Sequence, residues 1–181
     1  MESHLTRQER LKAYTEAILT GLESVSAERE QEFVQALLAA DQIVVAGRGR
    51  SGMMASAFAR RLGQMGLRAW GLDDSTVPRL GVGDVLVAVT GSGTTPTVSS
   101  LMHTARRGGA GVLLVTRRPA RDHKVADVVV ELQAPVGGTA YPLGTLFEVT
   151  ALAFLDLVVV DLIEALGTTE SDLGARHTNL E

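Results

Sequence analysis

Residues 43–52 read IVVAGRGRSG, an apolar run that passes directly into a glycine-rich segment. Residues 85–95, VLVAVTGSGTT, repeat the arrangement. Each apolar run predicts a buried β-strand, and the amphipathic stretch after each glycine-rich segment predicts a helix. Strands joined by helix-length segments pair in parallel through right-handed crossovers. These two stretches therefore decide the fold class, which is α/β.

The same alternation continues outward in both directions. The apolar runs predict strands at 43–46, 68–72, 85–89, 111–115 and 125–132. The segments between and around them predict helices at 3–22, 27–40, 53–65 and 96–107, and a long one from about residue 144. We expect a three-layer αβα sandwich around a five-stranded parallel sheet, because such a sheet is covered on both faces. One domain, residues 1–181, would comprise an N-terminal helical extension (1–40) and a sheet core with C-terminal helices (41–181).

Composition excludes several classes of function. The 181 residues carry a net charge of −4 and no cysteine. We expect no nucleic-acid partner, since no basic field would hold a polyanion, and no disulfide or thiolate metal site. Carboxylates interrupt the most apolar stretch, Val149–Leu166, so it predicts a buried helix rather than a membrane span. The polar N-terminus lacks a signal-peptide core, and we expect a cytoplasmic protein.

Both glycine-rich loops combine the features of an anion site. Each follows the carboxyl end of a strand and opens a helix, where free N–H groups and the helix dipole favour negative charge. Four hydroxyls could donate further hydrogen bonds, those of Ser51, Thr90, Ser92 and Thr95. Thr95 followed by Pro96 also predicts an N-cap with proline at the first helical position. Capping alone explains Thr95 but not two hydroxyl-rich loops, so we expect a phosphate ligand.

A dinucleotide site is the first alternative. Residues 47–52 match G-x-G-x-x-G, and Asp73 and Asp74 follow the second predicted strand, where a ribose-binding acid belongs. The chain has little room for a separate substrate domain, however, and the second loop predicts a compact anion nest rather than a long crevice. The paired loops favour a sugar phosphate over a dinucleotide.

The loops GRGRSG and TGSGTT resemble the signature loops of the sugar-isomerase (SIS) domain. Residues 142–148, PLGTLFE, and the ending 176–181, RHTNLE, are similar to the 6-phospho-3-hexuloisomerases in particular. The resemblance covers nearly the whole chain. It implies a flavodoxin-like strand order and homotetramers with active sites at subunit boundaries. It also implies interconversion of 3-hexulose 6-phosphate and fructose 6-phosphate in the ribulose monophosphate pathway of formaldehyde handling.

The resemblance also implies roles for particular residues. Glu148 would be the catalytic base, and His177 an acid/base or ring-opening group contributed by a neighbouring subunit. The phosphate would be held by Ser51, Ser92 and Thr95, assisted by Thr90 and Gly91, and possible substrate contacts are Gly49, Arg50 and Arg48. Two positions depart from the family: Thr94 replaces the usual glutamate, and Arg48 a small residue. Without the resemblance, Glu148 is explained equally well as a catalytic group and as an acid that complements a helix dipole. His177 is then better explained as a surface side chain.

Other outcomes stay open. The chain could isomerise another sugar phosphate, such as arabinose 5-phosphate or a heptulose phosphate, or serve as a non-catalytic sugar-phosphate sensor. We expect no cofactor and no metal, because no ligand spacing for a metal is present. A loose series of arginines predicts solvated faces and loop ends: Arg106, Arg107, Arg117, Arg118 and Arg121.

Overall fold

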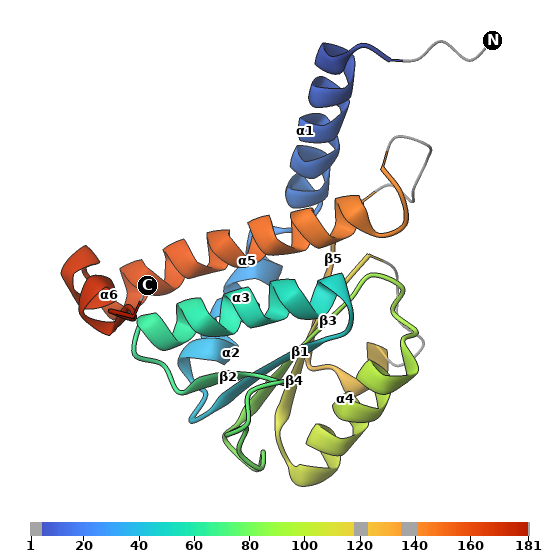
Figure 1. Cartoon of the computed structure of the whole chain (residues 1–181). Helices are drawn as coiled ribbons and strands as arrows, with labels where there is room; N and C mark the ends of the chain where they lie inside the picture. The colour runs from blue at the N-terminus through green and yellow to red at the C-terminus, as the bar shows by residue number, and fades with distance from the viewer. Residues whose placement is uncertain (1–4, 118–122, 135–140, 181) are drawn as a thin grey trace.

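A five-stranded parallel sheet forms the centre of the computed structural model, which describes residues 5–117, 123–134 and 141–180 (Figure 1). Its strands are β1 (Ile43–Gly47), β2 (Ala69–Gly71), β3 (Val85–Thr90), β4 (Gly111–Thr116) and β5 (Val128–Glu131). Their order is β2-β1-β3-β4-β5, with every neighbouring pair parallel. The predicted sheet and its flavodoxin-like order are confirmed.

Helices cover both faces of the sheet. Their bounds are α1 (Arg7–Glu23), α2 (Ala27–Leu38), α3 (Arg50–Gln64), α4 (Pro96–Gly108), α5 (Thr145–Leu166) and α6 (Glu170–Arg176), with a 3₁₀ turn η1 at His123–Val125. Helices α2, α3 and α5 pack on one face, while α4 and part of the β2–β3 connection pack on the other. The three predicted layers are therefore present. Among the described residues, no helix is both long and apolar enough to span a membrane.

Successive side chains of each strand enter opposite layers, as the pleat requires. Ile43 and Val45 of β1 join the core beneath α2, α3 and α5, whereas Val44 and Ala46 join the core beneath α4. All five residues of β1 and all six of β3 are buried. Burial on both faces explains why these strands are continuous apolar runs in the sequence rather than alternating ones.

The larger differences from the sequence-based expectation concern α3, β5 and the tail. Helix α3 begins at Arg50 instead of residue 53, because Gly49 with φ 59° forms its N-cap and lets the chain turn into the helix at once. The predicted strand 125–132 is shorter and follows η1. The polar tail contains helix α6, which the sequence analysis missed although Thr169 and Asp172 form a capping box. Outside the described residues lie the first residues of the predicted helix 3–22, Arg118, Arg121 and the terminal Glu181.

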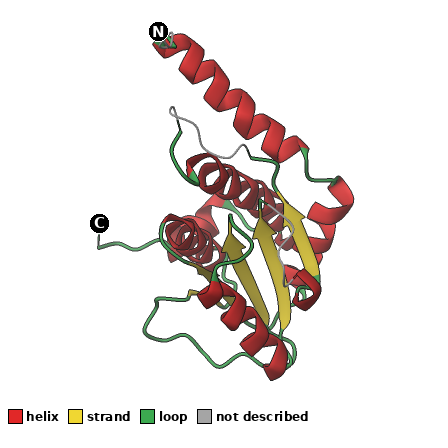
Figure 2. Cartoon of the chain, turned by 90° about the vertical axis from the view of Figure 1, so that its right-hand side faces the viewer, coloured by secondary structure: helices red, strands yellow, loops and turns green. Residues whose placement is uncertain are grey.

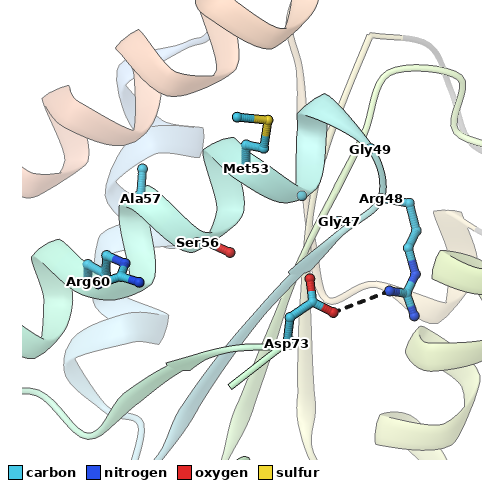
Figure 3. A pocket seen from close by; sticks show the side chains of 9 residues that line it. Gly47, Arg48, Gly49, Met53, Ser56, Ala57, Arg60 and Asp73 are labelled. Carbon is cyan, nitrogen blue, oxygen red and sulfur yellow. Dashed lines mark hydrogen bonds and ion pairs between the residues drawn. The ribbon is translucent and has the colours of Figure 1, made fainter. Parts of the chain in front are cut away.

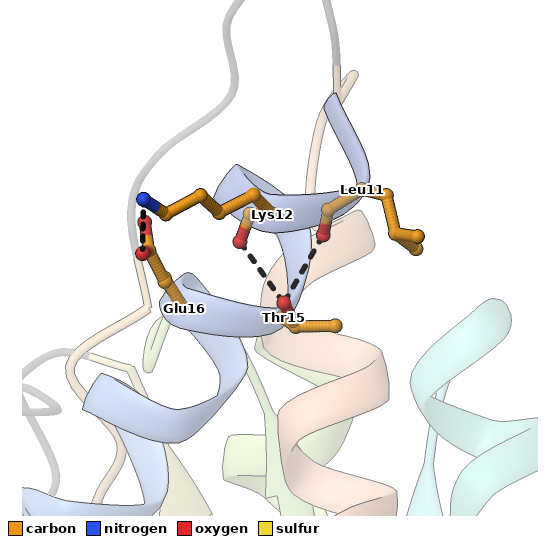
Figure 4. A network of polar contacts seen from close by, with 4 residues as sticks. All are labelled: Leu11, Lys12, Thr15 and Glu16. Carbon is orange, nitrogen blue, oxygen red and sulfur yellow. Dashed lines mark hydrogen bonds and ion pairs between the residues drawn. The ribbon is translucent and has the colours of Figure 1, made fainter. Parts of the chain in front are cut away.

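Helix α1 extends away from the sheet (Figures 1 and 2). Its polar groups are satisfied locally: the Thr15 hydroxyl donates to the carbonyls of Leu11 and Lys12, and Lys12 pairs with Glu16 at 3.7 Å (Figure 4). The C-terminal half of α1 packs against α5, with Gly21 buried. An ideal Cβ at Gly21 would lie 2.7 Å from Thr150 Cγ2, so only glycine permits this close helix contact.

We expect Gly21→Ala to destabilise the fold by about 1–3 kcal/mol through overpacking, despite alanine's better helix propensity. Thr150 is fully buried, and its hydroxyl donates to the Leu146 carbonyl, so it has no room to retreat. Adding Thr150→Ser, which removes the clashing methyl and keeps the hydroxyl, should restore most of the lost stability. Chemical denaturation of the single and double variants measures both effects. Equal stability of Gly21→Ala and wild type would contradict the packing argument.

Candidate functional site at the carboxyl end of the sheet

A cavity of about 380 Å³ lies at the carboxyl ends of β1 and β3. It brings together all five residues expected to hold the phosphate and the expected base. Its lining residues are Arg48, Ser51, Val89, Thr90, Gly91, Ser92, Thr95, Arg117, Leu143, Gly144, Phe147 and Glu148. In an open parallel sheet, ligands bind outside the carboxyl ends of the strands where the strand order reverses. The cavity occupies that position, because β1 runs to β2 on one side and β3 lies on the other.

Three helices begin at this cavity, and their first turns receive no side-chain cap from the N-cap residue. Gly49 precedes α3, Thr95 precedes α4 and Gly144 precedes α5, and in each case the N-cap side chain makes no capping hydrogen bond. Glycine has no side chain with which to cap. The N–H groups of these first turns and the positive ends of the three helix dipoles place positive potential on the cavity. An oxyanion would satisfy both.

The second loop forms a small hydroxyl network. Thr95 Oγ1 lies 2.9 Å from Thr90 Oγ1 and 3.2 Å from Ser92 Oγ, and the Thr94 N–H donates to Ser92 Oγ at 3.2 Å. Thr95 holds the predicted N-cap position with Pro96 at the first helical position, but the predicted side-chain cap is wrong. The Thr95 hydroxyl contacts its loop neighbours instead, which gathers three hydroxyls at one point of the loop.

Glu148 projects from the first turns of α5 beside the loops. Its side chain is 13% exposed, and Arg50 Nε, at the start of α3, lies 2.6 Å from Glu148 Oε2. This oxygen is buried and forms no well-aligned hydrogen bond among the described residues, so the contact with Arg50 is an ion pair. The arrangement fixes one carboxylate oxygen against a guanidinium. Arg50, expected as a possible substrate contact, thus touches the expected base directly.

Close packing sets the position of α5 against the second loop. An ideal Cβ at Gly91 would lie 2.7 Å from Phe147 Cδ1, and Phe147 is buried next to Glu148 in the chain. Leu143, two residues before α5, has φ 57° and is 90% exposed. A bulky residue in the left-handed region is an uncommon conformation that functional sites often contain. The sequence offers no signal for the conformation of Leu143.

The first loop opens onto a second cavity, of about 410 Å³, along α3 (Figure 3). Gly49 lines this cavity rather than the first one, whereas Arg48 lines both. Arg48 Nη1 lies 3.4 Å from Asp73 Oδ1, as the dashed line in Figure 3 shows. Asp73 is the acid that a dinucleotide site would direct to a ribose, and here it faces an arginine.

His177 lies at the opposite end of α3. It lines a third cavity, of about 480 Å³, together with Arg60, Arg61, Gln64 and Arg176. At the usual helical rise, α3 separates Ser51 from Gln64 by about 20 Å. The structure therefore does not bring His177 to the Glu148 of its own chain.

Arg117 is a lining residue that the sequence analysis interpreted as solvated. It directly follows β4, the strand next to β3, so its place at the carboxyl end of a central strand was the available signal. Within the described part of the chain, no group of three or more histidine, aspartate or glutamate side chains is placed to hold a metal ion.

No protein-family profile matches the chain. It is 33% identical to the 3-hexulose-6-phosphate isomerase of Bacillus subtilis over 168 residues, which cover 87% of this chain and 89% of that protein. It is 28% identical to an arabinose 5-phosphate isomerase of Pseudomonas aeruginosa over 169 residues, which are 86% of this chain but 51% of that protein.

A solved structure shares the whole fold. It is the crystal structure of a hypothetical protein from Methanococcus jannaschii, whose inferred molecular function is that of a 3-hexulose-6-phosphate isomerase. The two structures superpose with a TM-score of 0.89 at 29% sequence identity. The match covers 96% of this chain and 99% of that one. From the relatives, the parallel sheet and the loops at its carboxyl end, the chain belongs to the SIS-domain sugar-phosphate isomerases, the family of the 3-hexulose-6-phosphate isomerases.

Proposed function

We propose that this sugar-phosphate isomerase interconverts 3-hexulose 6-phosphate and fructose 6-phosphate, as in the ribulose monophosphate pathway. The observation that carries the proposal is one cavity in which three uncapped helix N-termini, a hydroxyl cluster and an arginine-paired carboxylate meet. The first two features suit a phosphate monoester, and the third suits proton transfer on the attached sugar. The name of the relative from Bacillus subtilis supports this choice of substrate.

The phosphate would bind the loops. Ser51, Ser92 and Thr95 would donate hydroxyl hydrogen bonds, with Thr90 and Gly91 completing the nest, and the first-turn N–H groups of α3 and α4 would add their own. Arg48 and Arg117 line the same cavity, and their positive charge offsets the phosphate's negative charge. The phosphate would thereby fix the sugar carbons beside Glu148.

Glu148 would then transfer the proton. Moving the carbonyl from C3 to C2 requires removal of the proton on C2, formation of an enediolate across C2 and C3, and return of the proton to C3, while a hydroxyl proton passes from O2 to O3. A single carboxylate can perform both transfers. As Glu148 accepts the proton it loses its negative charge, and Arg50, 2.6 Å away, becomes available to the negative enediolate oxygens. The ion pair would thus pass from the carboxylate to the intermediate and back.

His177 would act in the site of a neighbouring copy. Its own Glu148 lies near the other end of α3, so a role for His177 in proton transfer or ring opening requires another subunit. We accordingly propose a homo-oligomer, a tetramer by resemblance, with sites at subunit boundaries.

A second candidate is an isomerase of arabinose 5-phosphate, which the relative from Pseudomonas aeruginosa favours. Incubation of the pure protein with 3-hexulose 6-phosphate, arabinose 5-phosphate and a heptulose phosphate separates the candidates. Appearance of fructose 6-phosphate from the first substrate supports the proposal. Turnover of arabinose 5-phosphate alone would replace it with the second candidate.

We expect Ser92→Ala and Thr95→Val each to weaken substrate binding by about 1–3 kcal/mol, the cost of a lost hydrogen bond to a charged group. Titration calorimetry with fructose 6-phosphate measures the loss. Ser100→Ala, an exposed hydroxyl further along α4, is the matched control and should bind as wild type does. Unchanged affinity in both loop variants would place the phosphate elsewhere.

We expect Glu148→Gln to lower kcat by about 10²–10⁴-fold, because the amide keeps the size of the side chain but cannot accept the proton. Phosphate-driven binding should survive. Glu164→Gln, an exposed carboxylate on the same helix, serves as the control. Solvent deuterium exchange at the substrate carbon should disappear with turnover, and exchange at the wild-type rate would identify a different base.

We expect Glu148→Gln and His177→Ala chains, each nearly inactive alone, to recover activity when dissociated and reassembled together. With random pairing, about a quarter of the shared sites would hold both intact groups. Native mass spectrometry confirms that mixed oligomers form. Mixed oligomers without recovered activity would show that His177 does not serve another chain's Glu148.

A further inference from the structure

The connection between β2 and β3 contains no helix. Residues 72–84 form turns and irregular backbone, whereas parallel strands are usually joined through an α-helix. Among the described residues, α4 is the only α-helix whose side chains join the core on this face of the sheet (Figure 1). An irregular segment is thinner than a helix, which measures about 10 Å across. The cover of this face is therefore incomplete where the connection lies beside α4.

A cavity of about 420 Å³ lies at this gap, and its volume is within the range of small-molecule sites. Its floor is the apolar surface of β1 and β3, at Val44 and Leu86. One wall is the face of α4 that carries residues 101, 104, 105 and 108, which helical spacing brings together. The opposite wall is Leu72 and residues 77–80 of the connection. No described residue lines both this cavity and the candidate isomerase site, so the two sites are separate.

Contacts within the chain fix the positions of both walls. An ideal Cβ at Gly108 would lie 2.8 Å from the Leu80 carbonyl oxygen, so the end of α4 packs directly against the backbone of the connection. At the start of the connection, the Leu72 N–H donates to the Val45 carbonyl of β1 at 3.0 Å. The connection is thus held near both of its ends. The cavity is formed before any ligand arrives, which lowers the cost of binding one.

Apolar side chains around the cavity are incompletely covered. Leu72, Val77, Leu80 and Leu101 pack against the core of this face, yet each is only partly buried. Removing such apolar surface from water is favourable. A ligand that fills the cavity would cover all four side chains at once. The body of a ligand that fits this cavity is therefore apolar.

Two arginines add positive charge to the cavity. Arg79 and Arg107 line it, and none of its described lining residues is a carboxylate. Within the described part of the chain, the Arg79 guanidinium has no hydrogen bond or ion pair, and that of Arg107 donates only to the Thr104 hydroxyl, at 3.0 Å. A guanidinium binds a carboxylate through two parallel hydrogen bonds. The charge of the cavity thus complements a ligand with one anionic group.

We propose that this cavity binds a small amphipathic anion, a carboxylate on an aliphatic or aromatic body. The apolar body would lie on Val44 and Leu86, between α4 and the β2–β3 connection. Arg79 and Arg107 are both exposed, so they would hold the carboxylate at the solvent side of the cavity. A sugar phosphate does not suit this site, because its hydroxyls would lie against apolar walls. The inference is independent of the proposed isomerase activity, since the two sites share no lining residue.

Titration calorimetry with octanoate and octan-1-ol tests the site, because the two ligands have the same chain length and only octanoate is charged. We expect one octanoate to bind per chain, about tenfold more tightly than octan-1-ol, since hydrogen bonds between charged groups are the stronger kind. The double variant Arg79→Gln/Arg107→Gln should lose this preference while binding octan-1-ol as wild type does. Arg7→Gln, the same type of change on α1, is the control and should keep the preference.

Thr104→Phe tests the location of the site. Thr104 lines the cavity and is exposed, so a phenylalanine there would occupy the cavity while leaving the core unchanged. We expect the affinity for both ligands to fall about tenfold, because the new side chain covers the same apolar walls. Ser100→Phe, an exposed position of α4 outside the cavity, is the matched control. Circular dichroism confirms that each variant is folded.

Each outcome decides for or against the site. Octanoate binding with the expected losses supports it whether or not any sugar is turned over. Absence of saturable octanoate binding, or equal octanoate affinity in wild type and the double arginine variant, overturns the anion site. Unchanged binding by Thr104→Phe overturns its location. Saturating fructose 6-phosphate should leave octanoate binding as it is, and competition between the two would place octanoate in the candidate isomerase site and overturn the inference.

Discussion

Three helix N-termini left open at one point are the constraint on which the rest of the site depends. A side-chain cap contributes about 0.5–2 kcal/mol to a helix, and α3, α4 and α5 forgo it where they meet the cavity. The sheet permits this because the buried strands β1 and β3 anchor α3 and α4 through extensive apolar packing. The proposed phosphate would supply acceptors to α3 and α4, while α5 carries Glu148 in its first turn. Under the proposed function, the chain would exchange local helix stability for affinity toward a phosphate.

Glycine makes such a convergence sterically possible. An ideal Cβ at Gly47 would lie 2.7 Å from the Ser51 carbonyl oxygen, so the first loop can turn this tightly only without a side chain. Gly91 likewise lets α5 pack closely against the second loop, because the ring of Phe147 occupies the space that a side chain at position 91 would need. Since Glu148 follows Phe147 in the chain, the contact at Gly91 also fixes how far the carboxylate stands from the loops. Binding geometry and the proposed proton transfer are therefore coupled through a single packing contact.

The sequence predicted what is local and missed what depends on tertiary contacts. The strands, the loops and the place of Thr95 before α4 follow from apolar runs and turn residues within a few positions of one another. Glu148 had no local signal stronger than a helix acid, and only its resemblance to known isomerases singled it out. The Arg50–Glu148 ion pair and the position of Arg117 arise because distant segments meet at the sheet edge. The periodicity of apolar residues gives no signal for contacts between segments that are distant in the sequence.

The C-terminal tail lies too far from the two loops for His177 to reach the Glu148 of its own chain. Thr169 and Asp172 cap α6. The Arg176 guanidinium lies against Gly66, where an ideal Cβ would stand 3.2 Å from Arg176 Cζ. These contacts hold His177 at the C-terminal end of α3, whereas the two loops lie at its N-terminal end. Both ends are ordered by contacts of their own, so neither needs the other for its structure. A rigid helix between them prevents their meeting within one chain, and any chemistry that needs both must arise between chains.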